Sequence, residues 1–262
     1  MKVGTLDPGV KRGPVSHAVD EPTPDPKFDG LSSNFVGIVS HDVRGPAGNI
    51  IGYADLLLRE EQEFSLPPAQ RRMVERIRDN GQFILDLVHD LLDTVRIDAG
   101  TLKLTLGRHD VGAMIGECLQ RSALLAAATQ VGLRSVCPPG TIHAVLDRSR
   151  MLQVLMNLVS NAVKFSPEGS TVTVGADQAS RETSLWVSDS GQGIRPEEIQ
   201  NLCKKFARSS TRPVRGEKGA GLGLYIANEF TKLHRGSLAI ESTLGEGSRF
   251  TACLPRGRAV PR

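Results

Sequence analysis

The chain has 262 residues, enough for one large domain or two smaller ones with separate hydrophobic cores. Its formal net charge is only +3, and no Lys/Arg block alternates with aromatic residues, which argues against nucleic-acid binding. The four cysteines are widely scattered and lack the CxxC pairs of a zinc site, so we expect reduced thiols in a cytoplasmic protein. No stretch has the roughly 20 apolar residues that span a bilayer, and no signal peptide is apparent, so we predict no membrane span.

Residues 1–30 are predicted to be a disordered tail or linker. They hold five of the fifteen prolines and one aromatic residue, too little apolar surface to offset the entropy of ordering. Residues 258–262 are expected to be a second short tail. Between these two segments the sequence changes to patterns that are typical of folded domains.

Residues 31–98 are predicted to form a dimerisation domain built from a helical hairpin. Apolar residues recur there at alternating steps of four and three in two seams, separated by a turn at 63–68 that contains two prolines. The seams are Phe35, Val39, Val43, Pro46, Ile50, Tyr53 and Leu57, then Met73, Ile77, Ile84, Leu87, Leu91 and Val95. So wide an apolar face would be exposed on a single hairpin, so we expect a homodimeric four-helix bundle.

Residues 99–257 are predicted to form an α/β sandwich with helices on one face of a mixed sheet. Helices are expected over 111–128, over 147–165 with Asp147 as the N-cap, and over 222–233. Strands are expected over 102–106, 171–175, 183–189, 237–242 and 248–254.

The segment Ser-His-Asp-Val-Arg-Gly-Pro at 40–46 lies on the first predicted helix. Its simplest interpretation is an exposed polar stretch, because single histidines are common on surfaces. His41, however, falls off the apolar seam, and Asp42 beside it could accept a proton and make a ring nitrogen a better nucleophile. Pro46 removes a helical N–H, so we expect a bend near His41 that could admit a second domain.

The segment 40–57 resembles the H box of sensor histidine kinases. In that family the histidine accepts the γ-phosphoryl group of ATP, the next acidic residue acts as a base, and an aspartate of a response-regulator receiver domain then receives the phosphoryl group. The resemblance implies that His41 and Asp42 are catalytic and that the partners are a second copy of the chain and a receiver domain. A separate sensory protein is a further candidate partner.

The segment 157–165, Asn-Leu-Val-Ser-Asn-Ala-Val-Lys-Phe, places Asn157, Asn161 and Lys164 on one helix face. Three polar residues on one helix face usually indicate only a solvent-exposed surface, but core residues surround this face. Amide oxygens can bind Mg²⁺ and a lysine can meet phosphate. The segment resembles the family's N box, which implies that Asn161 holds Mg²⁺ with help from Asn157, Lys164 contacts phosphate, and Phe165 lies near the adenine.

Two glycine-rich segments follow. Asp189, Gly191, Gly193 and Ile194 form a turn after a predicted strand, which alone is weak evidence because Asp and Gly suit any tight loop. It resembles the family's G1 box, in which the aspartate accepts a hydrogen bond from the adenine amino group. The second segment precedes the last predicted helix, whose N-terminus suits phosphate, and it resembles the G2 box of an ATP site. Its residues are Gly219, Gly221, Gly223 and Leu224.

A basic stretch over 195–218 between the two glycine segments fits a mobile lid over phosphates. Phe206 in this lid corresponds to the family's F-box aromatic residue, and Cys203 stands where an aromatic residue is often found. Gly45 is a second departure. Family members that dephosphorylate their regulator usually have Thr or Asn at that position to orient a water, so we predict weak phosphatase activity.

Two other function classes compete with an ATP- and Mg²⁺-dependent histidine kinase. ATPases of the same superfamily usually carry a Glu that activates water one helical turn before the metal-binding Asn, but Asn157 is there and an amide is no general base. Related serine kinases that act as anti-sigma factors lack an upstream hairpin with an H box. A pseudokinase scaffold is the non-enzyme alternative, and the intact polar residues of the boxes argue against it.

Overall fold

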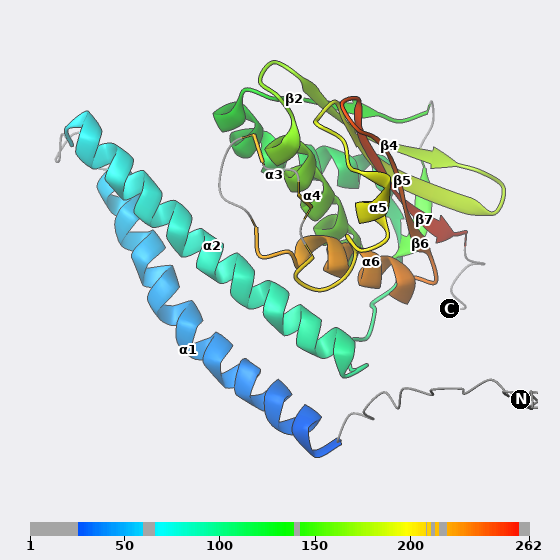
Figure 1. Ribbon diagram of the computed structural model, residues 1–262. Helices are drawn as coiled ribbons and strands as arrows, with labels where there is room; N and C mark the ends of the chain where they lie inside the picture. The colour runs from blue at the N-terminus through cyan, green and yellow to red at the C-terminus, as the bar shows by residue number, and fades with distance from the viewer. Residues whose placement is uncertain are drawn as a thin grey trace, which may run out of the picture.

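The computed structural model describes residues 26–59, 66–138, 142–207, 209–210, 213–214 and 219–256, with the backbone alone over 26–41. Helices α1 (Pro26–Arg59) and α2 (Pro68–Asp98) form an antiparallel hairpin beside an α/β domain (Figure 1). Helix α1 includes the last five residues of the predicted tail, because Pro26 is suited to a first helical turn. No helix of the described part is both long and apolar enough to cross a membrane.

The stripe that packs α1 against α2 differs from the predicted seams. Ala47 and Ala54 are both 3% exposed, and a Cβ added to Gly81 would lie 2.8 Å from Cγ1 of Ile51, so small residues bring the helices close together. Among the large apolar residues of the seams, Ile50 reaches this contact, with its Cγ2 3.5 Å from the place of a Cβ on Gly81. Several of the large seam residues are nevertheless exposed. Those that are exposed are Ile50, Tyr53, Leu57, Met73, Ile77, Ile84, Leu87 and Leu91. We call these eight residues the outer apolar face of the hairpin.

The main sheet of the α/β domain has five strands in the order β2-β4-β5-β7-β6. They are β2 (Gly132–Val136), β4 (Thr171–Gln178), β5 (Glu182–Asp189), β7 (Gly247–Pro255) and β6 (Ser237–Thr243). Strand β2 pairs with β4 in parallel and the other neighbours are antiparallel. A separate antiparallel pair joins β1 (Gly107–Asp110) to β3 (His143–Leu146). The predicted mixed sheet is confirmed.

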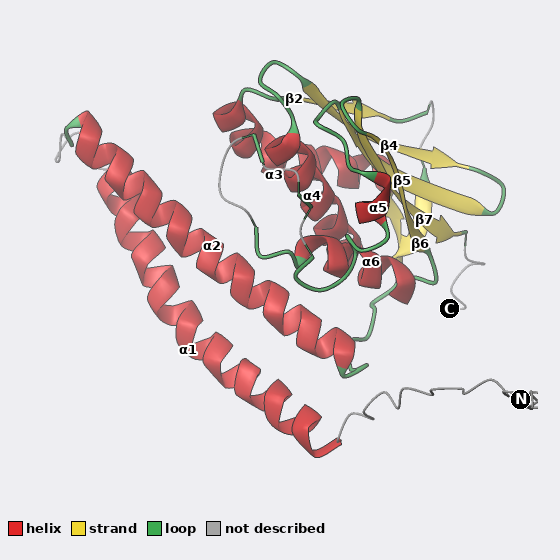
Figure 2. Cartoon of the chain, viewed as in Figure 1, coloured by secondary structure: helices red, strands yellow, loops and turns green. Residues whose placement is uncertain are grey.

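Three helices cover one face of the sheet and lie between it and the hairpin (Figure 2). They are α3 (Val111–Thr129), α4 (Arg148–Phe165) and α6 (Gly223–Leu233), and a short helix α5 spans Pro196–Ile199. Leu155 and Leu158 of α4 and Phe230 of α6 are fully buried in the core. Asp147 caps α4 as predicted, because its Oδ1 accepts hydrogen bonds from the backbone N–H groups of Ser149 and Arg150.

The predicted strand at 102–106 is wrong. Leu102 and Leu104 are half-buried between exposed neighbours, so the alternation of burial is present without a neighbouring strand to pair with. The backbone N–H of Thr105 donates instead to Oδ2 of Asp147 at 2.8 Å. Strands β1, β2 and β3 were not predicted, because they are only four or five residues long and β2 exposes most of its residues.

Leu155→Ala should lower the free energy of unfolding by about 2–5 kcal/mol, because it removes a fully buried side chain at the centre of α4. Leu124→Ala on α3 is the matched control, since Leu124 is 85% exposed and should change stability by no more than about 0.5 kcal/mol. Urea denaturation followed by circular dichroism measures both. Equal losses for the two variants would contradict this placement of the core.

Candidate active site

Helix α4 is the element on which the predicted nucleotide-binding segments meet. The side-chain amide of Asn157 donates from Nδ2 to the carbonyl of Gly223 at 3.0 Å, which ties α4 to the start of α6. The N–H of Val214, in the basic stretch, donates to the carbonyl of Lys164 at 3.0 Å. A Cβ on Gly191 would lie 2.6 Å from the carbonyl oxygen of Phe165. The structure therefore brings both glycine segments and the basic stretch to the same helix.

The polar face of α4 is half-buried and lies beside the buried residues of the same helix. Asn157, Asn161 and Lys164 are half-buried, while Leu155 and Leu158 on the same helix are fully buried. Burial lowers the pKa of the Lys164 ammonium, and the carboxylates of Asp86 and Asp90 on α2 oppose this shift. A partly desolvated cation of this kind attracts a phosphate more strongly than a fully hydrated one does.

The turn after β5 is held tightly by backbone contacts. Burial raises the pKa of Asp189, against hydrogen bonds that its carboxylate accepts from the backbone N–H groups of Gly191 and Ser248. Gly193 has φ +66°, and a Cβ there would lie 2.0 Å from the carbonyl of Thr243, so only glycine fits. The N–H of Ile194 donates to Oγ of Ser242 at 2.9 Å. Asp189 is thus a half-buried acceptor held by backbone hydrogen bonds.

The N-terminus of α6 is the third part of the site. Among the described residues no side-chain cap hydrogen bond is made at its N-cap, Leu222, and Lys164 Nζ lies 4.0 Å from the place of a Cβ on Gly219. Gly221 has φ +78° and packs closely on the backbone of Phe206. Phe206 itself is 61% exposed and has φ +59°, and Leu224 is half-buried. A helix N-terminus beside a lysine is suited to phosphate.

The predicted phosphoacceptor segment lies within α1, which continues through Pro46. The side chain of His41 is outside the described part of the chain, so its orientation away from the apolar seam stays a prediction. Asp42 is exposed. Gly45 is exposed too, and a Cβ there would meet open space.

A row of carboxylates on α2 was not predicted from the sequence. Asp86, Asp90 and Asp93 are spaced by four and three residues, so they share one face of the helix, and this face meets the α/β domain. Asp93 is only 6% exposed and pairs with Arg150 of α4. The helical spacing of the three acids was visible in the sequence, but nothing there showed which domain they face.

Comparison with known families assigns both parts of the chain. Residues 31–100 match the His Kinase A (phospho-acceptor) domain, and residues 146–258 match the histidine kinase-, DNA gyrase B-, and HSP90-like ATPase. The histidine protein kinase DivJ of Caulobacter vibrioides is 32% identical over 240 residues, which are 91% of this chain and 40% of that protein. The circadian input-output histidine kinase CikA of Synechococcus elongatus is 33% identical over 87% of this chain and 30% of its own length. The chain thus spans less than half the length of these curated relatives.

Solved structures agree with these relatives. Full-length ShkA in complex with AMPPNP superimposes with a TM-score of 0.65 at 27% identity, over 84% of this chain and 45% of that one. The histidine kinase AdeS of Acinetobacter baumannii shares the fold, with a TM-score of 0.59 at 20% identity over 79% of this chain and 95% of its own. A phosphoacceptor-type hairpin followed by an ATPase-type sandwich, matched over most of its length by known kinases, shows that the chain belongs to the sensor histidine kinases of two-component systems.

Proposed function

We propose that the chain is an ATP-dependent protein histidine kinase that phosphorylates His41 and passes the phosphoryl group to an aspartate of a response-regulator receiver domain. The observation that carries the proposal is the convergence on α4 of the turn after β5, the N-terminus of α6 and the basic stretch. The same chain also contains a phosphoacceptor-type hairpin.

The residues around α4 suit each part of ATP. Asp189, a half-buried acceptor, would receive a hydrogen bond from the adenine amino group, with Phe165 beside the base. Lys164 and the uncapped start of α6 would contact the phosphates. Mg²⁺ would neutralise phosphate charge when bound. Its ligands would be the side-chain oxygen of Asn161 and that of Asn157, whose nitrogen already donates to Gly223.

The proposed reaction is an in-line displacement at the γ-phosphorus. A ring nitrogen of His41 forms the new N–P bond, the bond from phosphorus to the bridging oxygen of ADP breaks, and Asp42 takes up the ring proton. Closure of the basic stretch over the phosphates would exclude water, so that the imidazole rather than water is the nucleophile. Transfer to the receiver domain then moves the phosphoryl group to a carboxylate oxygen and regenerates His41.

Incubation with γ-labelled ATP and Mg²⁺ should give acid-labile, alkali-stable label on the wild-type chain. His41→Ala should remove the label but keep nucleotide binding, because it deletes only the acceptor. Asn161→Ala should remove both. Asp42→Asn should slow labelling about 100-fold or more through loss of the base. Label on His41→Ala, or loss of its nucleotide binding, would show that the role of His41 is assigned wrongly.

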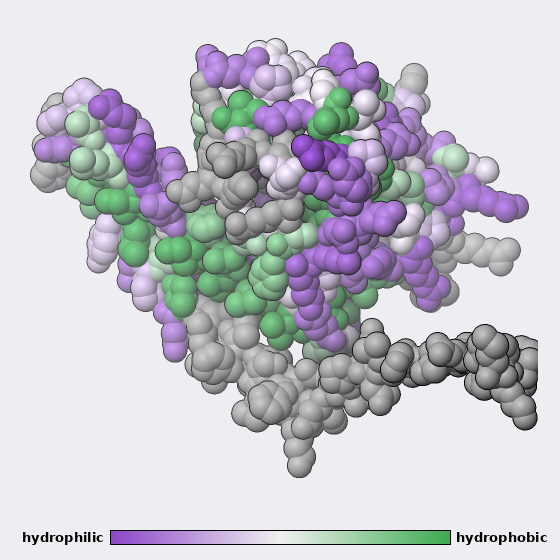
Figure 3. All heavy atoms as spheres, in the orientation of Figure 1, coloured by the Kyte–Doolittle hydropathy of each residue, from purple (hydrophilic) through white to green (hydrophobic). Residues whose placement is uncertain are grey.

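The proposed kinase acts as a homodimer through the outer apolar face of the hairpin. Figure 3 shows hydrophobic residues gathered along the hairpin. The eight large side chains of the outer apolar face are each at least 36% exposed. Contiguous apolar surface of this kind marks an interface. Two hairpins joined by these faces make a four-helix bundle, in which each helix buries both its small-residue stripe and its large one.

Analytical ultracentrifugation should therefore find a species of twice the chain mass of 28.2 kDa. Ile84→Glu should shift it toward the monomer, because the substitution puts a charge in the apolar contact. Leu124→Glu, on an exposed position of α3, is the control and should leave the dimer intact. A wild-type monomer, or a dimer that tolerates Ile84→Glu, would refute the interface.

Phosphatase activity toward the regulator is proposed to be weak, because Gly45 offers no side chain to hold an attacking water. Gly45→Thr should speed loss of phosphate from the purified phosphorylated regulator by about tenfold or more, since the new side chain has open space and can orient water. Gly48→Thr, one turn away and equally open, is the matched control. Fast dephosphorylation by the wild-type chain would disprove the role of Gly45.

We also propose a cytoplasmic location and a separate sensory protein as the source of input. All four cysteines are free in the structure, which suits a reducing compartment. These two proposals, and that of the receiver domain, are based on the similarity of the chain to two-component kinases.

A further inference from the structure

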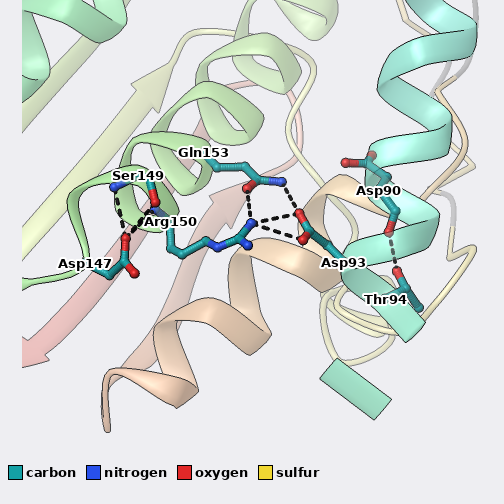
Figure 4. A network of polar contacts seen from close by, with 7 residues as sticks. All are labelled: Asp90, Asp93, Thr94, Asp147, Ser149, Arg150 and Gln153. Carbon is teal, nitrogen blue, oxygen red and sulfur yellow. Dashed lines mark hydrogen bonds and ion pairs between the residues drawn. The ribbon is translucent and has the colours of Figure 1, made fainter. Parts of the chain in front are cut away.

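The carboxylate of Asp93 on α2 is buried against the ATP-binding domain. Arg150 of α4 donates from Nη1 to both oxygens of Asp93, at 3.0 and 3.1 Å, and Gln153 Nε2 donates to Oδ2 at 2.9 Å (Figure 4). We call Asp93, Arg150 and Gln153 the latch. It joins the hairpin to the ATP-binding domain through Asp93 and Arg150, which are 57 positions apart in the chain.

The latch is held in place from the side of the ATP-binding domain. Arg150 Nη1 also donates to Oε1 of Gln153 at 3.2 Å, and the guanidinium lies 5.0 Å from the ring centroid of Phe230. Because Asp93 is 6% exposed while the side chain of Arg150 is 25% exposed, it is the carboxylate that cannot be hydrated freely when its partner is lost. Removing one partner of such a pair therefore favours separation of the two surfaces.

A second contact secures the end of α2. The hydroxyl of Tyr225 on α6 donates to Oδ1 of Asp98 at 2.9 Å, and Lys205 of the basic stretch forms an ion pair with the same carboxylate. The Lys205 ammonium also lies 5.3 Å from the ring centroid of Tyr225. The end of α2 therefore contacts both α6 and the stretch that is proposed to close over ATP.

The latch places Asp86 and Asp90 beside the nucleotide site. Both carboxylates interact electrostatically with Lys164, the residue proposed to contact phosphate. Burial raises the pKa of Asp90 to about 6; the charges of Asp86 and Asp93 on α2 add to the rise and Lys164 on α4 opposes it. Above that pH Asp90 is ionised, so the face of α2 that meets Lys164 is negatively charged.

We propose that the latch holds the ATP-binding domain against α2 in a resting arrangement, in which Asp86 and Asp90 repel the triphosphate of ATP beside Lys164. Opening the latch removes both charges from the site and strengthens ATP binding. By linkage, bound ATP opens the latch to the same extent. The inference rests on the proposed function, because it takes Lys164 to be a phosphate contact.

Charge reversal tests the latch directly. Asp93→Arg and Arg150→Asp should each bind a fluorescent ATP analogue with Mg²⁺ about fivefold more tightly than the wild-type chain, above pH 6. The double exchange restores an ion pair and should return the affinity to the wild-type value. Asp79→Arg is the control, because Asp79 lies on α2 and is exposed, and it should change nothing. Thermal melting checks that each variant is folded.

Asp90→Asn tests the repulsion without breaking the latch. It should bind the analogue more tightly above pH 6, and the difference from the wild-type chain should shrink as Asp90 becomes protonated at lower pH.

Unchanged or weaker binding by folded Asp93→Arg and Arg150→Asp would overturn the latch. Asn161→Ala separates the two proposals: if it binds as the wild-type chain does, the ATP site itself is wrong and the latch falls with it. If it loses binding while Arg150→Asp matches the wild type, only the latch is refuted.

Discussion

A carboxylate that is buried between two domains must keep a fixed cation beside it, and the pair of Asp93 with Arg150 meets this requirement. The pair fixes which face of α2 meets α4, and so fixes which groups face the nucleotide site. Arg150, Gln153, Asn157, Asn161 and Lys164 follow one another on α4 at steps of three and four residues. A single stripe of this helix therefore runs from the contact with α2 to the phosphate site, and a movement of α4 at one end reaches the other.

Helix α2 presents three different faces to three different surroundings. Gly81 and its neighbours along the helix pack on α1, where small side chains permit a close approach. The large apolar side chains, such as Ile84 and Leu87, form part of the outer apolar face. Its carboxylates face the ATP-binding domain. One helix thus connects the dimer contact, the phosphoacceptor hairpin and the nucleotide site, which is what a kinase needs if a signal in the bundle is to control access to ATP.

The parts that sequence predicted well are those determined by local chemistry. Asp147 caps α4 because its side chain reaches N–H groups only two and three residues ahead, and β5 is a largely buried strand of β-branched and apolar residues. The contact of both glycine segments with α4 was expected from their resemblance to the G1 and G2 boxes of the family. The features that were not predicted correctly depend on contacts between residues that are far apart in the chain. Leu102 and Leu104 alternate like a strand but have no partner strand, and the spacing of Asp86, Asp90 and Asp93 does not reveal that Arg150 lies opposite.

The ion pair of Lys205 with Asp98 offers the most direct measurement of the resting arrangement, because a carbodiimide joins an amine to a carboxylate only when the two are in contact. The wild-type chain, treated with carbodiimide and digested, should yield the peptide that links these two residues. Saturation with a non-hydrolysable ATP analogue and Mg²⁺ should strongly reduce its amount, while Asn161→Ala should keep the link under the same conditions. An undiminished link in a wild-type chain that demonstrably holds the analogue would contradict the account.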